Sequence, residues 1–163
     1  MKRAIIIGAS SGLGRGVAET LLKQGWLVGV AARRLEQLES LRAHYGTERV
    51  AVAQVDVTNP LAVNALDSLL AEVGTPDLFL YVSGKGGQNP MLDEKLELDI
   101  IKTNCEGMVR IVDHFVNYIK QTPYYTPKNR AHIAVVTSVA GTAGIGSAPA
   151  YSASKSWQRR WRA

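Results

Sequence analysis

Residues 4–14 are Ala4-Ile5-Ile6-Ile7-Gly8-Ala9-Ser10-Ser11-Gly12-Leu13-Gly14, and a helical pattern begins directly after them. The apolar, mostly β-branched start predicts a short strand buried on both faces of a parallel sheet. The glycines leave room for a sharp turn and for a ligand close to the backbone. The free N–H groups of the next helix would point back at this turn and attract an anion. The predicted phosphate-binding turn consists of Gly8, Ser10, Ser11, Gly12, Leu13 and Gly14. A tight turn without a ligand is the alternative.

The rest of the chain alternates strand and helix patterns. Strands are predicted over residues 4–7, 27–32, 50–55, 78–82 and 133–137. Helices are predicted over residues 12–24, 35–44, 60–74 and 91–119, the last with a break near 90 or 93, and from residue 151 onward. This order is typical of right-handed βαβ units. We therefore predict an α/β Rossmann-type, doubly wound parallel sheet of about five strands with helices on both faces and a ligand at the carboxyl ends of the strands.

Length and composition predict one domain over residues 1–163. No apolar run is long enough to cross a bilayer, and the single cysteine, Cys105, fits a reducing compartment, so we expect a cytoplasmic protein without a membrane partner. The net charge of +5 comes largely from Arg159, Arg160 and Arg162 near the end. This cluster favours a charged helix end over a nucleic-acid surface. No metal site is predicted.

Two positions indicate which nucleotide the turn would hold. At the end of the second strand, Arg33 and Arg34 stand where an acidic residue would bind a ribose 2′-hydroxyl, and arginine there suits a 2′-phosphate. An ordinary surface arginine pair is the alternative. After the third strand, Asp56 and Val57 lie where a carboxylate can meet an adenine amino group. The arginines favour NADP(H) over NAD(H), whereas the adenine contact is common to both.

The reacting groups are predicted near the fifth strand. Tyr151 and Lys155 are four residues apart, which places them on one face of a helix. A nearby ammonium favours the phenolate form of a tyrosine, as a general acid–base for carbonyl reduction requires. Ser138, just past the strand, could hold the substrate oxygen as charge develops on it. Judged by itself, a Tyr-x-x-x-Lys spacing is more often structural.

Taken together, these motifs resemble the short-chain dehydrogenase/reductase family over residues 4–156. The resemblance rests on the glycine turn, Asp56-Val57, Asn104 in Thr-Asn-Cys-Glu-Gly, Ser138 in Val-Val-Thr-Ser-Val-Ala-Gly, and Tyr151-Ser-Ala-Ser-Lys155. It implies hydride transfer between a nicotinamide ring and a small-molecule alcohol or carbonyl substrate, and the arginines indicate NADP(H) as the cofactor.

The resemblance also implies a role for each residue. Tyr151 would be the acid–base and would also contact the cofactor. Lys155 would bind the nicotinamide ribose and tune the tyrosine, and Ser138 would orient the substrate. Asn104 would hold a water in a proton relay, although a polar residue that only steadies its helix is the alternative. Residues of the loop after the fourth strand, Ser83 and Gly84, would border the cofactor.

Two departures from the family pattern stand out. Tyr81-Val82-Ser83-Gly84 replaces the usual Asn-Asn-Ala-Gly. The sequence also ends about two turns after Lys155, where the family continues into a sixth strand, further helices and a seventh strand, so we expect a C-terminally truncated member. The alternative to an active oxidoreductase is therefore a catalytically impaired nucleotide-binding or assembly protein of the same fold. An uncovered fifth strand predicts a homo-oligomer, a dimer or a tetramer.

Overall fold

A computed structural model describes residues 1–161 of the chain; Arg162 of the basic tail lies outside the described residues. The strands are β1 (Arg3–Ile7), β2 (Leu27–Ala32), β3 (Val50–Gln54), β4 (Leu78–Tyr81) and β5 (His132–Val135). The helices are α1 (Gly12–Lys23), α2 (Leu35–Tyr45), α3 (Ala62–Val73), α4 (Glu94–Ile101), α5 (Gly107–Gln121) and α6 (Pro149–Arg160). A π-helical turn, η1 (Lys102–Glu106), joins α4 to α5, and a short 3₁₀ turn, η2 (Val139–Gly141), follows β5.

The five strands form one parallel sheet in the order β3-β2-β1-β4-β5. Because β2 and β4 flank β1, the chain reverses its direction of travel across the sheet at β1. The helices on either side of this reversal leave a crevice at the carboxyl ends of the strands. The fold predicted from the sequence is confirmed, and the switch point lies where the glycine turn begins.

Side chains of β1 alternate between two apolar cores, as expected for a strand buried on both faces. Ile5 and Ile7 pack with α3 and α5, and Ile6 packs on the opposite face with α1 and α2. All three isoleucines are fully buried. A buried isoleucine contributes about 1.5–3 kcal/mol by leaving water, so this strand fixes both faces of the sheet.

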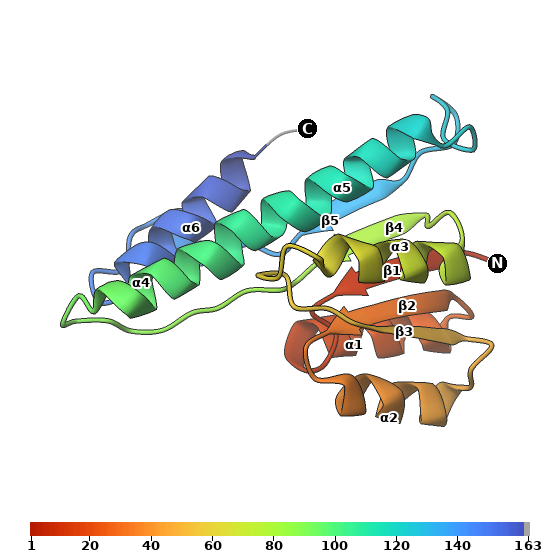
Figure 1. Ribbon diagram of the computed structural model, residues 1–163, viewed down its shortest axis with the longest axis horizontal. Coiled ribbons are helices and arrows are strands. Elements are labelled where there is room, and N and C mark those ends of the chain that lie inside the picture. Colours follow the sequence, from red (N-terminus) through yellow and green to blue (C-terminus); the bar gives the residue numbers. More distant parts are fainter. Residues whose placement is uncertain (162–163) are drawn as a thin grey trace.

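The long helical stretch differs from the prediction over residues 91–119. It begins at Glu94 because the side chain of Asp93 caps the helix by accepting a hydrogen bond from the Leu96 N–H (3.0 Å). It then passes through the π turn and continues to Gln121. Figure 1 shows α4, η1 and α5 as one rod that extends beyond the sheet, with α6 beside its first half. The described residues include no helix both long and apolar enough to cross a membrane.

Candidate functional site

The glycine turn is held against the loop that follows β4. Gly8 has a φ of +99°, a conformation that favours glycine. A Cβ there would lie 2.6 Å from the Ser83 backbone nitrogen, and one at Gly14 would overlap the Gly8 carbonyl. The Gly8 N–H donates to the Ala31 carbonyl of β2 (2.7 Å). Only glycine therefore fits at positions 8 and 14, and the start of the turn is hydrogen-bonded to the end of β2.

A cavity of about 250 Å³ opens beside this turn at the carboxyl ends of the strands. Most residues predicted to bind a cofactor line it: Gly8, Ser10, Ser11, Arg33, Arg34, Asp56, Val57, Ser83 and Gly84. Of the rest of the turn, Gly12 and Leu13 face another shallow hollow on α1, and Gly14 is buried beneath the turn. Five further lining residues were not predicted to bind the cofactor: Ala32, Val55, Thr58, Val82 and Thr103.

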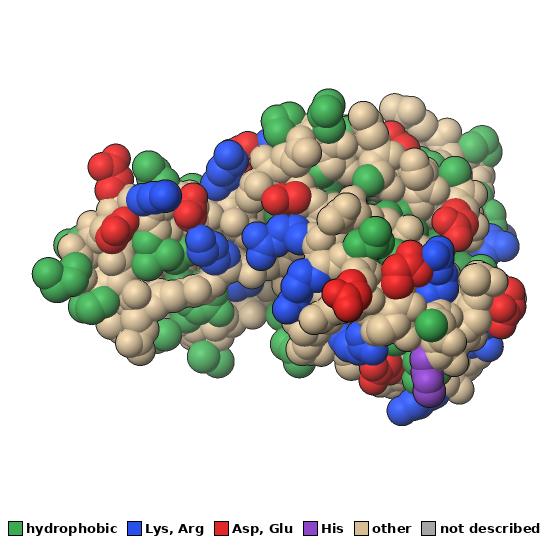
Figure 2. Space-filling view, turned by 60° about the horizontal axis from the view of Figure 1, so that its bottom comes forward, with side chains coloured by type: hydrophobic (Ala, Val, Ile, Leu, Met, Phe, Trp, Pro, Cys, Tyr) green, Lys and Arg blue, Asp and Glu red, His purple; other side chains and the backbone are tan. Residues whose placement is uncertain are grey.

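Arginine and serine side chains form the polar wall of the cavity. The Arg34 guanidinium donates from Nη2 to the hydroxyl oxygens of Ser10 (3.0 Å) and Ser11 (2.6 Å). Both arginines are exposed at the mouth. Figure 2 shows Lys and Arg side chains gathered where the narrow part of the molecule, which holds α4 and α6, joins the broad part that holds the sheet. A guanidinium beside hydroxyls and free helix N–H groups suits a phosphate group, so these residues fit a phosphorylated nucleotide.

Asp56 presents a carboxylate to the same cavity. Burial raises its pKa, whereas hydrogen bonds from the backbone and side chain of Thr58 (2.9 and 2.8 Å) lower it. The positive charges of Arg33 and Lys102 act in the same direction, so the pKa lies below its usual value. The group is therefore an anionic hydrogen-bond acceptor at neutral pH, as an adenine amino group would require.

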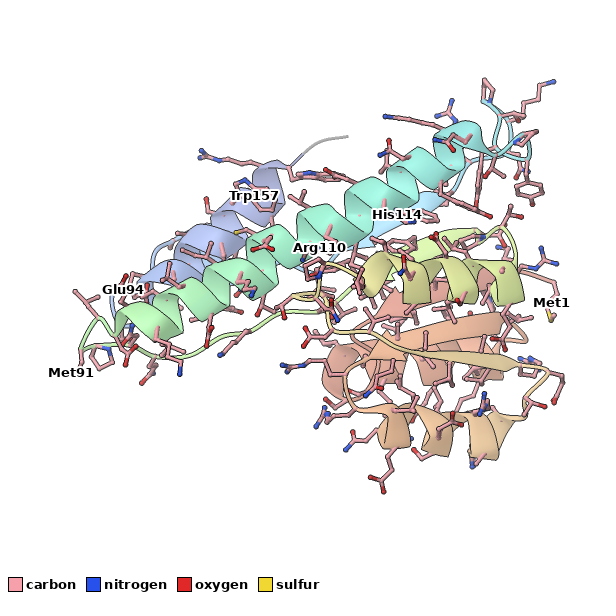
Figure 3. The ribbon with its side chains drawn as sticks, in the orientation of Figure 1. Met1, Met91, Glu94, Arg110, His114 and Trp157 are labelled. Carbon is pink, nitrogen blue, oxygen red and sulfur yellow. The ribbon has the colours of Figure 1, made fainter. Side chains whose placement is uncertain are left out.

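Val57 is positioned by the long helix. The Arg110 guanidinium of α5 donates to the Val57 carbonyl (2.6 Å), and Figure 3 shows this side chain at the middle of the rod. At Gly107, a Cβ would lie 2.7 Å from Val57 Cγ2. The helix thus approaches the loop after β3 as closely as a residue without a side chain allows.

Tyr151 and Lys155 lie on the first turns of α6, with the Lys155 Nζ 6.0 Å from the centre of the Tyr151 ring. The helix begins at Pro149, two residues before the predicted start. Ser138 caps the turn η2 by accepting a hydrogen bond from the Ala140 N–H (3.2 Å). This turn packs on α6, because a Cβ at Gly141 would lie 2.7 Å from the Lys155 carbonyl. In the described residues, neither Ser138 nor the Tyr–Lys pair lines the 250 Å³ cavity.

Asn104 is fully buried within the π turn. Its side chain accepts from the Lys85 N–H (2.7 Å) and donates to the Lys85 carbonyl (2.8 Å) and the Ser154 hydroxyl (2.9 Å). It therefore ties the loop after β4 to α6. A π turn within an α-helix is rare and frequent at functional sites. Nothing in the sequence pattern of residues 91–119 indicated it.

Tyr81 stands where the family carries an asparagine, and it is fully buried. Its hydroxyl lies 3.5 Å from the Thr103 carbonyl, and burial raises its pKa well above the usual range. The tyrosine is therefore a neutral core residue that fills the space between β4 and the π turn. The Gly84 that ends this stretch still lines the cavity.

Two polar residues that contact α6 or lie on it, Glu97 and Gln158, were not predicted from the sequence. Glu97 of α4 accepts the Ala150 N–H at the start of α6 (2.8 Å), which places a carboxylate at the positive end of that helix. Gln158 is buried and contacts both Lys155 and Asn104. Both are ordinary polar residues on amphipathic helices. Ala150, the partner of Glu97, and Asn104, the second partner of Gln158, lie more than 50 residues away in the sequence. No local signal could have identified them.

The family described as short chain dehydrogenase matches this chain over residues 2–159. An uncharacterized oxidoreductase of Myxococcus xanthus is 35% identical, over 96% of this chain and 61% of its own length. The chain thus spans less than two thirds of this relative.

Solved structures with the same fold differ in the nicotinamide cofactor that they contain. An alcohol dehydrogenase from Thermococcus sibiricus, complexed with 5-hydroxy-NADP, has a TM-score of 0.86 and 25% identity, covering 98% of this chain and 67% of that one. A short-chain dehydrogenase/reductase from Burkholderia phymatum in complex with NAD has a TM-score of 0.81 and 28% identity, covering 95% and 55%.

Proposed function

Since the chain belongs to the short-chain dehydrogenase family, we propose that it binds NADP(H) and transfers a hydride between this cofactor and a small alcohol or carbonyl substrate. The observation that carries the proposal is the cavity in which the glycine turn, Arg34 and Asp56 meet. When bound, the nicotinamide supplies or accepts the hydride. The residues of this chain supply the binding site and the proton.

In the reductive direction, Tyr151 would donate its phenolic proton to the substrate oxygen as the hydride reaches the carbonyl carbon, and an alcohol results. The ammonium of Lys155 is close to the tyrosine ring and stabilises the phenolate that remains. Ser138 would hold the substrate oxygen by hydrogen bonding. The oxidative direction reverses each step.

The two arginines support a preference for NADP(H). Replacing both Arg33 and Arg34 with Ala is expected to weaken NADPH binding about 100-fold, because two charge-assisted contacts to the 2′-phosphate are lost. NADH affinity, which involves no such phosphate, should change by about twofold or less. Fluorescence titration with each nucleotide measures both.

The matched control replaces Lys128 and Arg130 with Ala, which also removes two positive charges, from exposed residues just before the edge strand β5. It should leave both affinities unchanged. Equal loss of NADPH and NADH binding in the double variant would show that the arginines are structural, and the preference would then have to be abandoned.

A second candidate is a nucleotide-binding protein of this fold without turnover. One observation favours it: the cavity collects the nucleotide-binding residues, whereas Ser138 and Tyr151 lie outside its lining in the described part of the chain. Such a protein would bind NADPH as tightly as the enzyme would. Only a Tyr151-dependent reaction separates the two candidates.

We also propose that the chain self-associates. Within residues 1–161, β5 pairs only with β4. Leu98, Ile101 and Val109 of the rod are exposed apolar side chains at helical spacing. Sedimentation velocity at micromolar concentration is expected to give a dimer or a tetramer, and Ile101→Glu with Val109→Glu should shift it toward monomer. A wild-type monomer would contradict this proposal.

A further inference from the structure

Gln158 connects Lys155 to the π turn. It lies one helical turn after Lys155 on α6 and is 3% exposed. Its Oε1 accepts a hydrogen bond from the Lys155 ammonium (2.9 Å), and its Nε2 donates to the Asn104 backbone carbonyl (2.8 Å). One neutral side chain thus bridges a buried cation and a buried carbonyl on two different helical segments.

The amide is chemically matched to both partners. An ammonium can only donate hydrogen bonds and a carbonyl can only accept them, so an amide between them has one satisfactory orientation. Its oxygen must face Lys155 and its NH₂ group must face Asn104, as the structure has them. A side chain with two acceptors or no polar atoms could not serve both contacts.

The partners of this bridge are themselves fixed. Lys155 is 5% exposed, and its ammonium also donates to the Val136 carbonyl just past β5 (3.0 Å). Asn104 is fully buried, and its side chain binds Lys85 and Ser154. The bridge therefore joins α6, the π turn and the end of β5 at one point.

The bridge also sets the distance between Lys155 and the cavity. A Cβ at Gly84, which lines the cavity, would lie 3.4 Å from the Lys155 Nζ. Two of the three ammonium donors are used by Gln158 and Val136, so one remains for another acceptor.

We propose that Gln158 is a positioning residue that holds the Lys155 ammonium beside the cavity wall by anchoring it to the Asn104 carbonyl of the π turn. The contacts stand independently of any reaction, whereas their meaning for catalysis rests on the proposed function. Because the Gln158 amide is uncharged, it holds the buried Lys155 ammonium in place without neutralising its charge.

The pKa of Lys155 should depend on whether Gln158 accepts a hydrogen bond from its ammonium. Burial lowers its pKa, and Cys105 of the π turn acts in the opposite direction. The titratable groups that face the ammonium are Cys105 and, from its own helix, Tyr151, while the end of β5 and the loop after β4 contribute the Val136 carbonyl and Gly84. Removing the Gln158 acceptor should lower the pKa further, and a carboxylate in its place should raise it.

The experiment is an NMR pH titration of the full chain with ¹³C-labelled lysine side chains and no nucleotide, in which Lys155→Arg assigns the resonance. Gln158→Met is expected to lower the Lys155 pKa by about one unit, and Gln158→Glu to raise it by about one unit. Gln121→Glu, which adds the same charge at an exposed position on α5, should leave it unchanged. If neither Gln158 variant moved the pKa by more than about 0.3 units, the proposal would be overturned.

Thermal unfolding and an NADPH titration of the same samples complete the test. If Gln158→Met does not fold, the folded Gln158→Glu variant decides alone by the direction of its shift. NADPH affinity is expected to fall about tenfold in Gln158→Met, because the ammonium is no longer held beside the cavity. If the pKa shifts occur but the wild-type chain binds no NADPH, the bridge stands and the proposed function fails.

Discussion

Replacing Tyr151 with Phe is expected to lower the turnover of a simple ketone or aldehyde by about 10²–10⁴-fold. Phenylalanine cannot donate the proton that the substrate oxygen receives. It keeps the aromatic ring, against which the backbone of Gly86 packs so closely that a Cβ there would lie 3.1 Å from Tyr151 Cε2. The loss should therefore come from chemistry and leave NADPH affinity within about twofold of wild type.

The measurement is a screen of NADPH oxidation with several carbonyl compounds, accompanied by an NADPH binding titration. Tyr124→Phe removes a hydroxyl from an exposed tyrosine in the loop after α5 and should not change either quantity. Turnover that survives in Tyr151→Phe would exclude this tyrosine as the acid–base. Binding without Tyr151-dependent turnover would favour the second candidate, a protein that holds the nucleotide without using it.

Two glycines of α1 should respond to alanine with opposite signs. Gly14→Ala is expected to lower the free energy of unfolding by about 3 kcal/mol, because its Cβ would overlap the Gly8 carbonyl oxygen and lie 2.9 Å from the Gly8 carbonyl carbon. Gly16→Ala is expected to raise it by about 0.5–1 kcal/mol, since alanine favours the helix and nothing lies within 4 Å of the new Cβ.

Urea denaturation of the two variants and the wild type gives both values. The two positions lie two residues apart on the same helix. Gly16→Ala therefore measures the gain in helix propensity that both Gly-to-Ala changes share. Gly14→Ala should also lose NADPH binding, because the new Cβ would displace Gly8, which lines the cavity. A stable Gly14→Ala variant with normal binding would refute the account of the turn.

Much of the fold followed from local patterns. Ala4 to Ile7 predicted a strand buried on both faces, and alternating strands and helices predicted the sheet and its crevice. The cavity residues were accessible to the same reasoning, because glycine spacing and the residues that end each strand are local signals. Arg34 and Asp56 were identified in this way, and both line the cavity.

The π turn and the contacts of α6 could not be predicted, because they depend on partners far apart in the sequence. Lys102–Glu106 carries no breaker, and its geometry is set by packing against α6 and the loop after β4. Glu97 and Gln158 are typical of solvated helix faces until the fold brings Ala150 and Asn104 to them. Polar residues that position a site are in this respect harder to predict than the residues that bind.

The most direct test of the central claim is a fluorescence titration of the wild-type chain with NADPH and with NADH. Saturable NADPH binding in the micromolar range is expected, tighter than NADH binding by about tenfold or more, because Arg33 and Arg34 meet the 2′-phosphate. Absence of saturable binding, or NADH affinity equal to or higher than that of NADPH, would contradict that claim.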